Sequence, residues 1–124
     1  MQTSDAWKQS IVAADATDAV KVNFATSVMP PYTEGAYTTM TPRTLRSDFV
    51  DTWNADPEGA ESRRDELGGE VMAAVRGGRL EELLPFTGQS AGLVHEVRPA
   101  AEIVATLVRE AENALEAAGR RTTS

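Results

Sequence analysis

One segment of this 124-residue chain carries a convincing alternating pattern of a β-strand, which limits the folds that it can form. In residues 18–27, the apolar side chains of Val20, Val22 and Phe24 alternate with polar neighbours, as in a half-buried strand. The remaining segments show helical periodicity or clusters of turn residues. We therefore predict one domain, residues 1–124, of the α+β class, predominantly helical with a small strand component.

Two helices are predicted in the first half of the chain. Residues 4–16 place their apolar side chains along one helical face. Thr41 followed by Pro42 indicates a second helix start, because a threonine hydroxyl can accept hydrogen bonds from free amides and proline suits the first turn. Between these helices, residues 29–42 are rich in proline, tyrosine and threonine, and we predict a long ordered loop with room for one short edge strand.

A further helical segment begins with the same kind of signal. Asp56 precedes Pro57, and a charged helical pattern follows. A glycine pair at residues 68–69 interrupts this pattern, which predicts either two helices or one kinked helix. Gly77 and Gly78 then end the segment, since glycine is favoured just after a helix.

The clearest helical pattern lies near the C-terminus. Residues 99–118 follow a loop of small residues, 86–92, and carry one continuous apolar stripe. The stripe consists of Ile103, Val104, Leu107, Val108, Ala111 and Leu115. We predict that Gly119 caps this helix and that residues 119–124 form a frayed tail.

Composition and charge exclude several classes of partner. The chain has 12 Lys and Arg against 19 Asp and Glu, a formal net charge of −7, which disfavours nucleic acid and anionic membrane surfaces. It has no cysteine, so it forms neither disulfides nor thiolate metal sites. The first residues show no signal-peptide pattern. We expect a cytoplasmic protein without nucleic-acid or membrane partners.

The sequence shows no complete catalytic or metal-binding motif. His95 is the only histidine, and the surrounding alternation predicts that it faces solvent. Four glutamates, at positions 66, 70, 81 and 82, are interpreted as a solvated helix face rather than as a catalytic pair. We therefore predict no catalytic residue and no metal ligand.

The segment from Gly88 to Gly92 leaves two interpretations open. Its glycines permit close backbone approach, and Gln89 can both donate and accept hydrogen bonds. The segment is either a tight structural loop or a loop that faces a ligand. In a third hypothesis, Gln89, Tyr32 and Tyr37 would together hold a small ligand.

The order of several short motifs resembles the C-terminal portion of the nitronate monooxygenase (2-nitropropane dioxygenase) family. The resemblance covers residues 5–118, and the motif at 88–94 joined to that at 97–104 is its most specific part. The motifs are Trp7-Lys8-Gln9, Thr17-Asp18-Ala19-Val20, Pro42-Arg43-Thr44-Leu45-Arg46 with Phe49-Val50, Gly88-Gln89-Ser90-Ala91-Gly92-Leu93-Val94, and Val97-Arg98-Pro99-Ala100-Ala101-Glu102-Ile103-Val104.

This resemblance implies both a fold and a chemistry. The family oxidises alkyl nitronates with oxygen to carbonyl compounds and nitrite, using FMN in a TIM-like barrel. The chain would correspond to the helical substrate domain and closing helix, with the barrel absent. By the same resemblance, Gln89 and Gly88 would lie towards the flavin, and Ser90, Trp7 and Lys8 towards the substrate.

We therefore predict the C-terminal part of an FMN-dependent nitronate monooxygenase that is inactive without a flavin-binding barrel. The chain alone is expected to bind no FMN, and a small nitronate would be a substrate only of a complete enzyme. Its partner would be a barrel-bearing chain or a second copy of itself. The alternative is a non-enzymatic helical interaction protein that retains the same fold.

Overall fold

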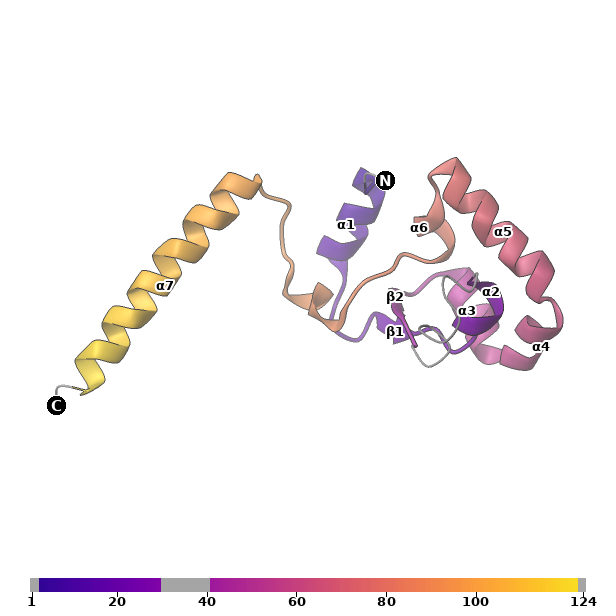
Figure 1. The fold of residues 1–124 in the computed structure, drawn as a ribbon, viewed down its shortest axis with the longest axis horizontal. Helices are drawn as coiled ribbons and strands as arrows, with labels where there is room; N and C mark the ends of the chain where they lie inside the picture. The colour runs from indigo at the N-terminus through magenta and orange to yellow at the C-terminus, as the bar shows by residue number, and fades with distance from the viewer. Residues whose placement is uncertain (1–2, 30–40, 123–124) are drawn as a thin grey trace.

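The computed structural model describes residues 3–29 and 41–122, which form mainly helices and one small sheet (Figure 1). The predicted class, helical with a small strand component, is confirmed, and these residues contain no barrel. The elements are α1 (Asp5–Ala13), β1 (Ala19–Lys21), α2 (Ala25–Val28), β2 (Arg43–Leu45), α3 (Asp48–Ala55), α4 (Pro57–Ser62), α5 (Arg64–Gly77), α6 (Leu80–Leu83), the 3₁₀-helix η1 (Gln89–Leu93) and α7 (Ala100–Thr122).

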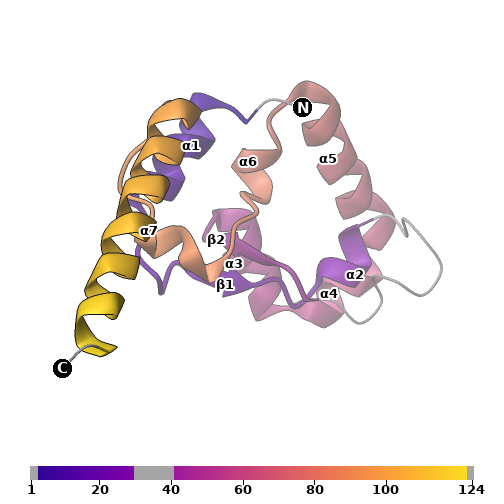
Figure 2. The same cartoon turned by 60° about the vertical axis from the view of Figure 1, so that its left-hand side comes forward.

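The described residues divide into two regions that differ in packing. We call residues 3–29 and 41–93 the body and residues 94–122 the C-terminal arm. Figure 1 shows α7 projecting away from the body at the end of an extended segment, and Figure 2 shows α2 to α6 gathered on the opposite side. None of the described helices is both long and apolar enough to cross a membrane.

The two strands pair antiparallel, with Ala19 opposite Leu45 and Lys21 opposite Arg43. The strand predicted over residues 18–27 is therefore too long, although Val22 and Phe24 are buried as the alternation indicated.

Asn54 binds the outer edge of the chain where β1 ends. Its side-chain amide donates to the Lys21 carbonyl at 2.8 Å, and its oxygen accepts from the Asn23 amide at 2.9 Å. On the side that faces β2, the Val22 amide donates to the Pro42 carbonyl at 3.0 Å. A side chain from α3 thus satisfies backbone groups of this edge that β2 does not reach.

The helix start predicted at Thr41-Pro42 is wrong. The residues that follow form β2, and α3 begins after Ser47, whose hydroxyl accepts from the Val50 amide at 3.1 Å. The same hydroxyl donates to the Leu83 carbonyl at 2.6 Å, which ties α3 to α6. Pairing with β1 therefore prevailed over the local helix signal. Most of the loop predicted at 29–42 lies outside the described residues.

Other local signals are confirmed. Asp56 caps α4 by accepting a hydrogen bond from the Gly59 amide at 2.9 Å, and Pro57 occupies the first turn. Gly78 ends α5 with a positive φ of 67°, the left-handed conformation that glycine adopts without strain. The segment forms two helices, as one of the two interpretations required, but they are divided at Arg63, and α5 continues through the glycine pair at 68–69 where the interruption was predicted.

The core of the body lies between α2, α4, α5 and α6. Phe24 is almost fully buried and meets Phe49 edge-on, with ring centroids 5.7 Å apart. The large apolar side chains that are at most 2% exposed come from several elements. They are Phe24, Leu67, Leu84, Val22, Val28 and Val50.

The C-terminal helix is longer than predicted. It continues through Gly119 to Thr122, so the cap predicted at Gly119 is wrong. Among the described glycines only Gly78 has a positive φ, and Gly119 keeps helical geometry instead. Residues 123–124 lie outside the described residues.

Candidate functional site

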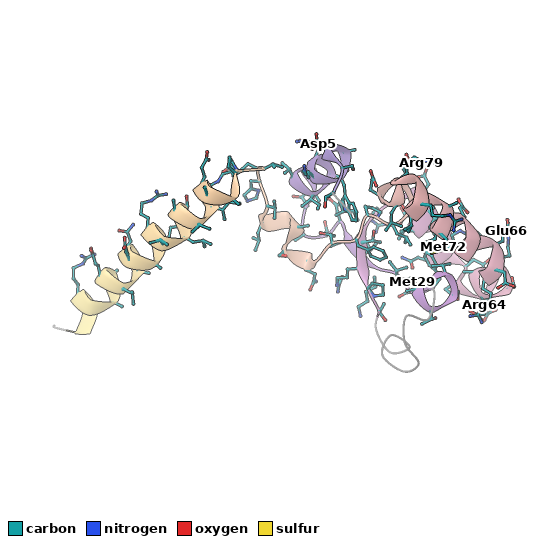
Figure 3. The ribbon with its side chains drawn as sticks, turned by 45° about the horizontal axis from the view of Figure 1, so that its top comes forward. Asp5, Met29, Arg64, Glu66, Met72 and Arg79 are labelled. Atoms are coloured by element: carbon teal, nitrogen blue, oxygen red, sulfur yellow. The ribbon has the colours of Figure 1, made fainter. Side chains whose placement is uncertain are left out.

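Helix α1 and the 3₁₀-helix η1 pack together and carry all five residues assigned to a site by resemblance. Ser4 caps α1 by accepting a hydrogen bond from the Trp7 amide at 3.1 Å. Lys8 forms an ion pair with Asp5 at 2.8 Å, and Figure 3 shows Asp5 on the outer side of α1. The structure thus brings together two motifs that are about 80 positions apart in the sequence.

Gly92 explains how closely these two elements approach. A Cβ atom at this position would lie 2.5 Å from the Ala16 backbone nitrogen and 2.9 Å from its Cα. Both are backbone atoms, so any larger residue would push η1 away from the segment after α1. The segment predicted as a loop is thus helical over Gln89–Leu93, and Gly92 has a structural role in it.

The residues of this segment that are expected to face flavin or substrate lie on the surface at the start of η1. Gly88, Gln89 and Ser90 are exposed. A Cβ at Gly88 would find only ordinary contacts, the nearest being the Ser90 hydroxyl at 3.5 Å. Their roles towards flavin and substrate stay predictions. Tyr32 and Tyr37, the other residues of the small-ligand hypothesis, lie outside the described residues.

Trp7 is the most distinctive of the five residues. Its indole Nε1 is buried, with no hydrogen-bond partner among the described residues. An indole N–H usually finds a partner when it is buried, so Trp7 is an exception within the described part of the chain. The Thr44 hydroxyl, inside the sheet, shares this property.

A shallow groove lies beside α1, lined by none of the five residues assigned by resemblance, and was not predicted from the sequence. Its volume is about 260 Å³, and it is open to solvent. It is lined by Ser10, Ala13, Ala14, Asp18, Leu45, Arg46, Glu81 and Pro85. Ligand pockets usually enclose roughly 300 to 1,000 Å³ and cover most of their ligand. The groove is therefore too small and too open to enclose a flavin nucleotide.

The charges of the groove come from separate elements. Arg46 follows β2 and pairs with Asp51 at 2.8 Å. Glu81 lies on α6, where the Ser4 hydroxyl and then a backbone amide donate to it and lower the pKa of its carboxyl below the usual 4.5. The sequence analysis interpreted Glu81 as a solvated residue, and no local pattern could have joined it to α1.

The remaining polar candidates lie on the surface. His95 is exposed, as the sequence predicted. Glu66 forms a 2.6 Å ion pair with Arg63, and Figure 3 shows it on the outer edge of α5. The described residues contain no group of three His, Asp or Glu side chains arranged to hold a metal ion.

Comparison with known proteins gives one informative likeness. No protein-family model and no curated protein matches the chain. The fold is similar to the structure of FabK from Thermotoga maritima, with a TM-score of 0.61 and 26% sequence identity. The match covers 93% of this chain but 33% of FabK, so the chain spans about a third of that protein's length. The likeness supports the predicted resemblance at the level of the family.

Proposed function

We propose that the chain is the substrate-domain part of an FMN-dependent oxidoreductase related to nitronate monooxygenases and to FabK. The observation that carries this proposal is the unequal match, in which nearly all of this chain corresponds to a third of FabK. Catalysis would then need a flavin-binding barrel, which the described residues do not form. A barrel-bearing chain would be the partner, and we place the protein in the cytoplasm.

The physical requirements of a flavin site support the assignment of flavin binding to a separate barrel. A TIM-like barrel needs on the order of 250 residues, and its phosphate site is built from loops at the ends of its strands. The described residues offer a two-stranded sheet and an open groove of about 260 Å³. FMN bound by a complete enzyme would supply the redox chemistry, while this chain would position the substrate.

The finer proposal is that the complete enzyme oxidises alkyl nitronates. In that enzyme, Gly88 and Gln89 would approach the flavin, with the Gln89 amide able to donate to or accept from the ring edge. Ser90, Lys8 and Trp7 would face the substrate. Helix α1 and η1 already hold these residues on neighbouring elements.

A chimera tests the proposal. This chain would replace the matching third of Thermotoga maritima FabK, and the purified product would be assayed for retained flavin absorbance and for nitrite released from an alkyl nitronate. We expect flavin retention in the chimera and none in the chain alone. Flavins also transfer hydride, so a second assay would follow the oxidation of NADPH in the presence of an unsaturated thioester. The assay that gives turnover would identify the substrate class.

Point variants of the chimera test the site assignment. Gln89→Ala should weaken flavin retention, whereas Asn113→Ala, an exposed amide on α7, should leave it unchanged. A folded chimera that stays colourless would contradict the proposed function. A flavin-bound chimera with equal retention in both variants would contradict only the role of Gln89.

The exposed apolar face of α7 favours a second candidate, a non-enzymatic interaction protein with the same fold. Such a protein would bind another protein through this face and would not need FMN. Nitrite production or thioester reduction by the chimera would argue against it.

A further inference from the structure

Residues 88–90, which we call the exposed edge, follow a segment that is bound to the sheet. The Thr87 amide donates to the Arg43 carbonyl at 3.1 Å, and the Pro85 carbonyl accepts from the Leu45 amide at 3.0 Å. Strand β2 thus pairs with β1 along one side and with this segment along the other. The chain therefore enters η1 from a fixed position.

Gly92 holds the other end of η1 against the segment that leaves α1. Figure 1 shows the two segments side by side, and a Cβ atom at Gly92 would lie 2.5 Å from the Ala16 nitrogen. Among the described glycines only Gly78 has a positive φ, so the backbone of Gly92 is open to any residue. Glycine is needed at this position for space and not for conformation.

Ala16 is itself held in place, in a turn that two hydrogen bonds close. The Asp15 amide donates to the Asp18 carboxylate at 2.8 Å, and the Asp18 amide donates to the Asp15 carbonyl at 3.0 Å. Where β1 begins, the Arg43 guanidinium donates to the Ala19 carbonyl at 2.8 Å. Arg43 therefore connects both supports of η1, because its carbonyl binds the segment before η1 and its side chain binds the strand after the turn.

We propose that Gly92 is a positioning residue, whose contact with Ala16 fixes the exposed edge for contact with FMN. This rests on the proposed function, in which Gly88 and Gln89 approach the flavin. Groups that are held in place before binding lose less conformational freedom when the ligand binds. The packing of η1 on α1 also fixes the exposed edge relative to the residues of α1 that would face the substrate. Gly92 acts through η1 and needs no contact with the ligand.

Amide hydrogen exchange on the full chain, followed by NMR, tests whether Gly92 fixes the exposed edge. The Ala91 amide donates to the Gly88 carbonyl at 3.0 Å and reports on η1, while the Leu67 amide donates to the Arg63 carbonyl at 3.0 Å and reports on the core. In Gly92→Ala we expect the exchange rate to rise roughly tenfold more at Ala91 than at Leu67. Equal increases at the two amides, or no increase, would overturn the positioning role.

Two further variants make the exchange experiment specific. Gly69→Ala adds the same methyl group to α5, where it meets no atom within 4 Å, and should leave exchange at Ala91 unchanged. Arg43→Met removes the guanidinium bond to Ala19 and loosens the support of η1 more mildly than Gly92→Ala, so it should raise the Ala91 rate by a smaller factor. A faster rate in Gly69→Ala, or an unchanged rate in Arg43→Met, would contradict the proposed support.

The chimera with FabK tests whether the fixed edge matters for FMN. Dissociation constants for FMN would be measured for Gly92→Ala, Gln89→Ala and the double variant. If Gly92 acts through the exposed edge, the double variant loses less affinity than the product of the two single losses. Losses that multiply independently would overturn the role towards FMN. A folded chimera that binds no FMN would instead contradict the proposed function, and exchange on the chain alone would still decide whether Gly92 fixes the edge.

Discussion

Helices α5 and α7 differ in a way that the sequence alone does not predict. Helix α7 has the more regular apolar stripe, yet its large apolar side chains are exposed. The apolar pattern of α5 is interrupted by Gly68 and Gly69, yet the helix is continuous and buries Leu67, Val71 and Ala74, packing against α2 and α6. An amphipathic pattern therefore indicates that a face will be covered, but not which molecule covers it.

The largest expected contrast comes from truncating one apolar side chain in each region. Phe24→Ala removes a ring that is 1% exposed and should lower the free energy of unfolding by about 3–5 kcal/mol. Leu107→Ala, at an exposed position of the arm, should change it by about 0.5 kcal/mol or less in the monomer. Urea denaturation at low protein concentration measures both, and equal losses would mean that α7 packs on the body.

Two glycines sharpen the contrast next. Gly92→Ala would force a Cβ against the Ala16 backbone, and we expect a loss of about 1–3 kcal/mol. Gly119→Ala meets no atom within 4 Å and should stabilise α7 by about 1 kcal/mol, because alanine favours helix more than glycine does. Thermal unfolding followed by circular dichroism would report both, and a harmless Gly92→Ala would contradict the close packing of η1.

Polar contacts provide a smaller test. Ser47→Ala removes the cap of α3 and the donor to the Leu83 carbonyl, so the body should lose about 1–2 kcal/mol. In the arm, Thr106→Ala removes the acceptor for Arg98, a contact that does not involve the body. Denaturant midpoints should fall for Ser47→Ala only, and a similar fall in both would show that the arm stabilises the body.

The smallest expected effect is on acid stability. The pKa of Glu81 is lowered by the Ser4 hydroxyl, so its ionised form favours the folded state above about pH 4.5, and this contribution is lost as the pH falls through the folded-state pKa. Glu81→Gln should therefore weaken the dependence of stability on pH in this range. Glu82→Gln, on the same helix without the Ser4 contact, is the control, and identical pH profiles would exclude the contact between α1 and α6.

The successes and errors of the sequence analysis have one physical origin. Asp56 and Gly78 were placed correctly because a cap depends on atoms within three or four residues. Thr41 and Pro42 carried an equally good local signal, but the residues that follow pair with β1, with Thr44 opposite Val20 from 24 residues away. The hydrogen bonds of Asn54 to the edge of this strand are equally distant in sequence, and no pattern within residues 18–27 could reveal them.

For the candidate site, too, the sequence revealed the segments and the structure revealed their arrangement. The sequence identified both segments, and the structure showed that α1 and η1 are neighbours. The groove beside α1 could not be predicted from the sequence, since Asp18, Arg46 and Glu81 come from three separate parts of the chain.

The sequence by itself determined the helical character of the chain, the caps of α4 and α5 and the apolar stripe of α7. These features depend on hydrogen bonds and side-chain periodicity within a few residues. Only the tertiary structure decided where the strands end, how closely Gly92 approaches Ala16 and that the described body does not bury the apolar stripe of α7. Those outcomes depend on which distant groups satisfy the backbone and bury the apolar surface, and that competition is settled by the folded chain as a whole.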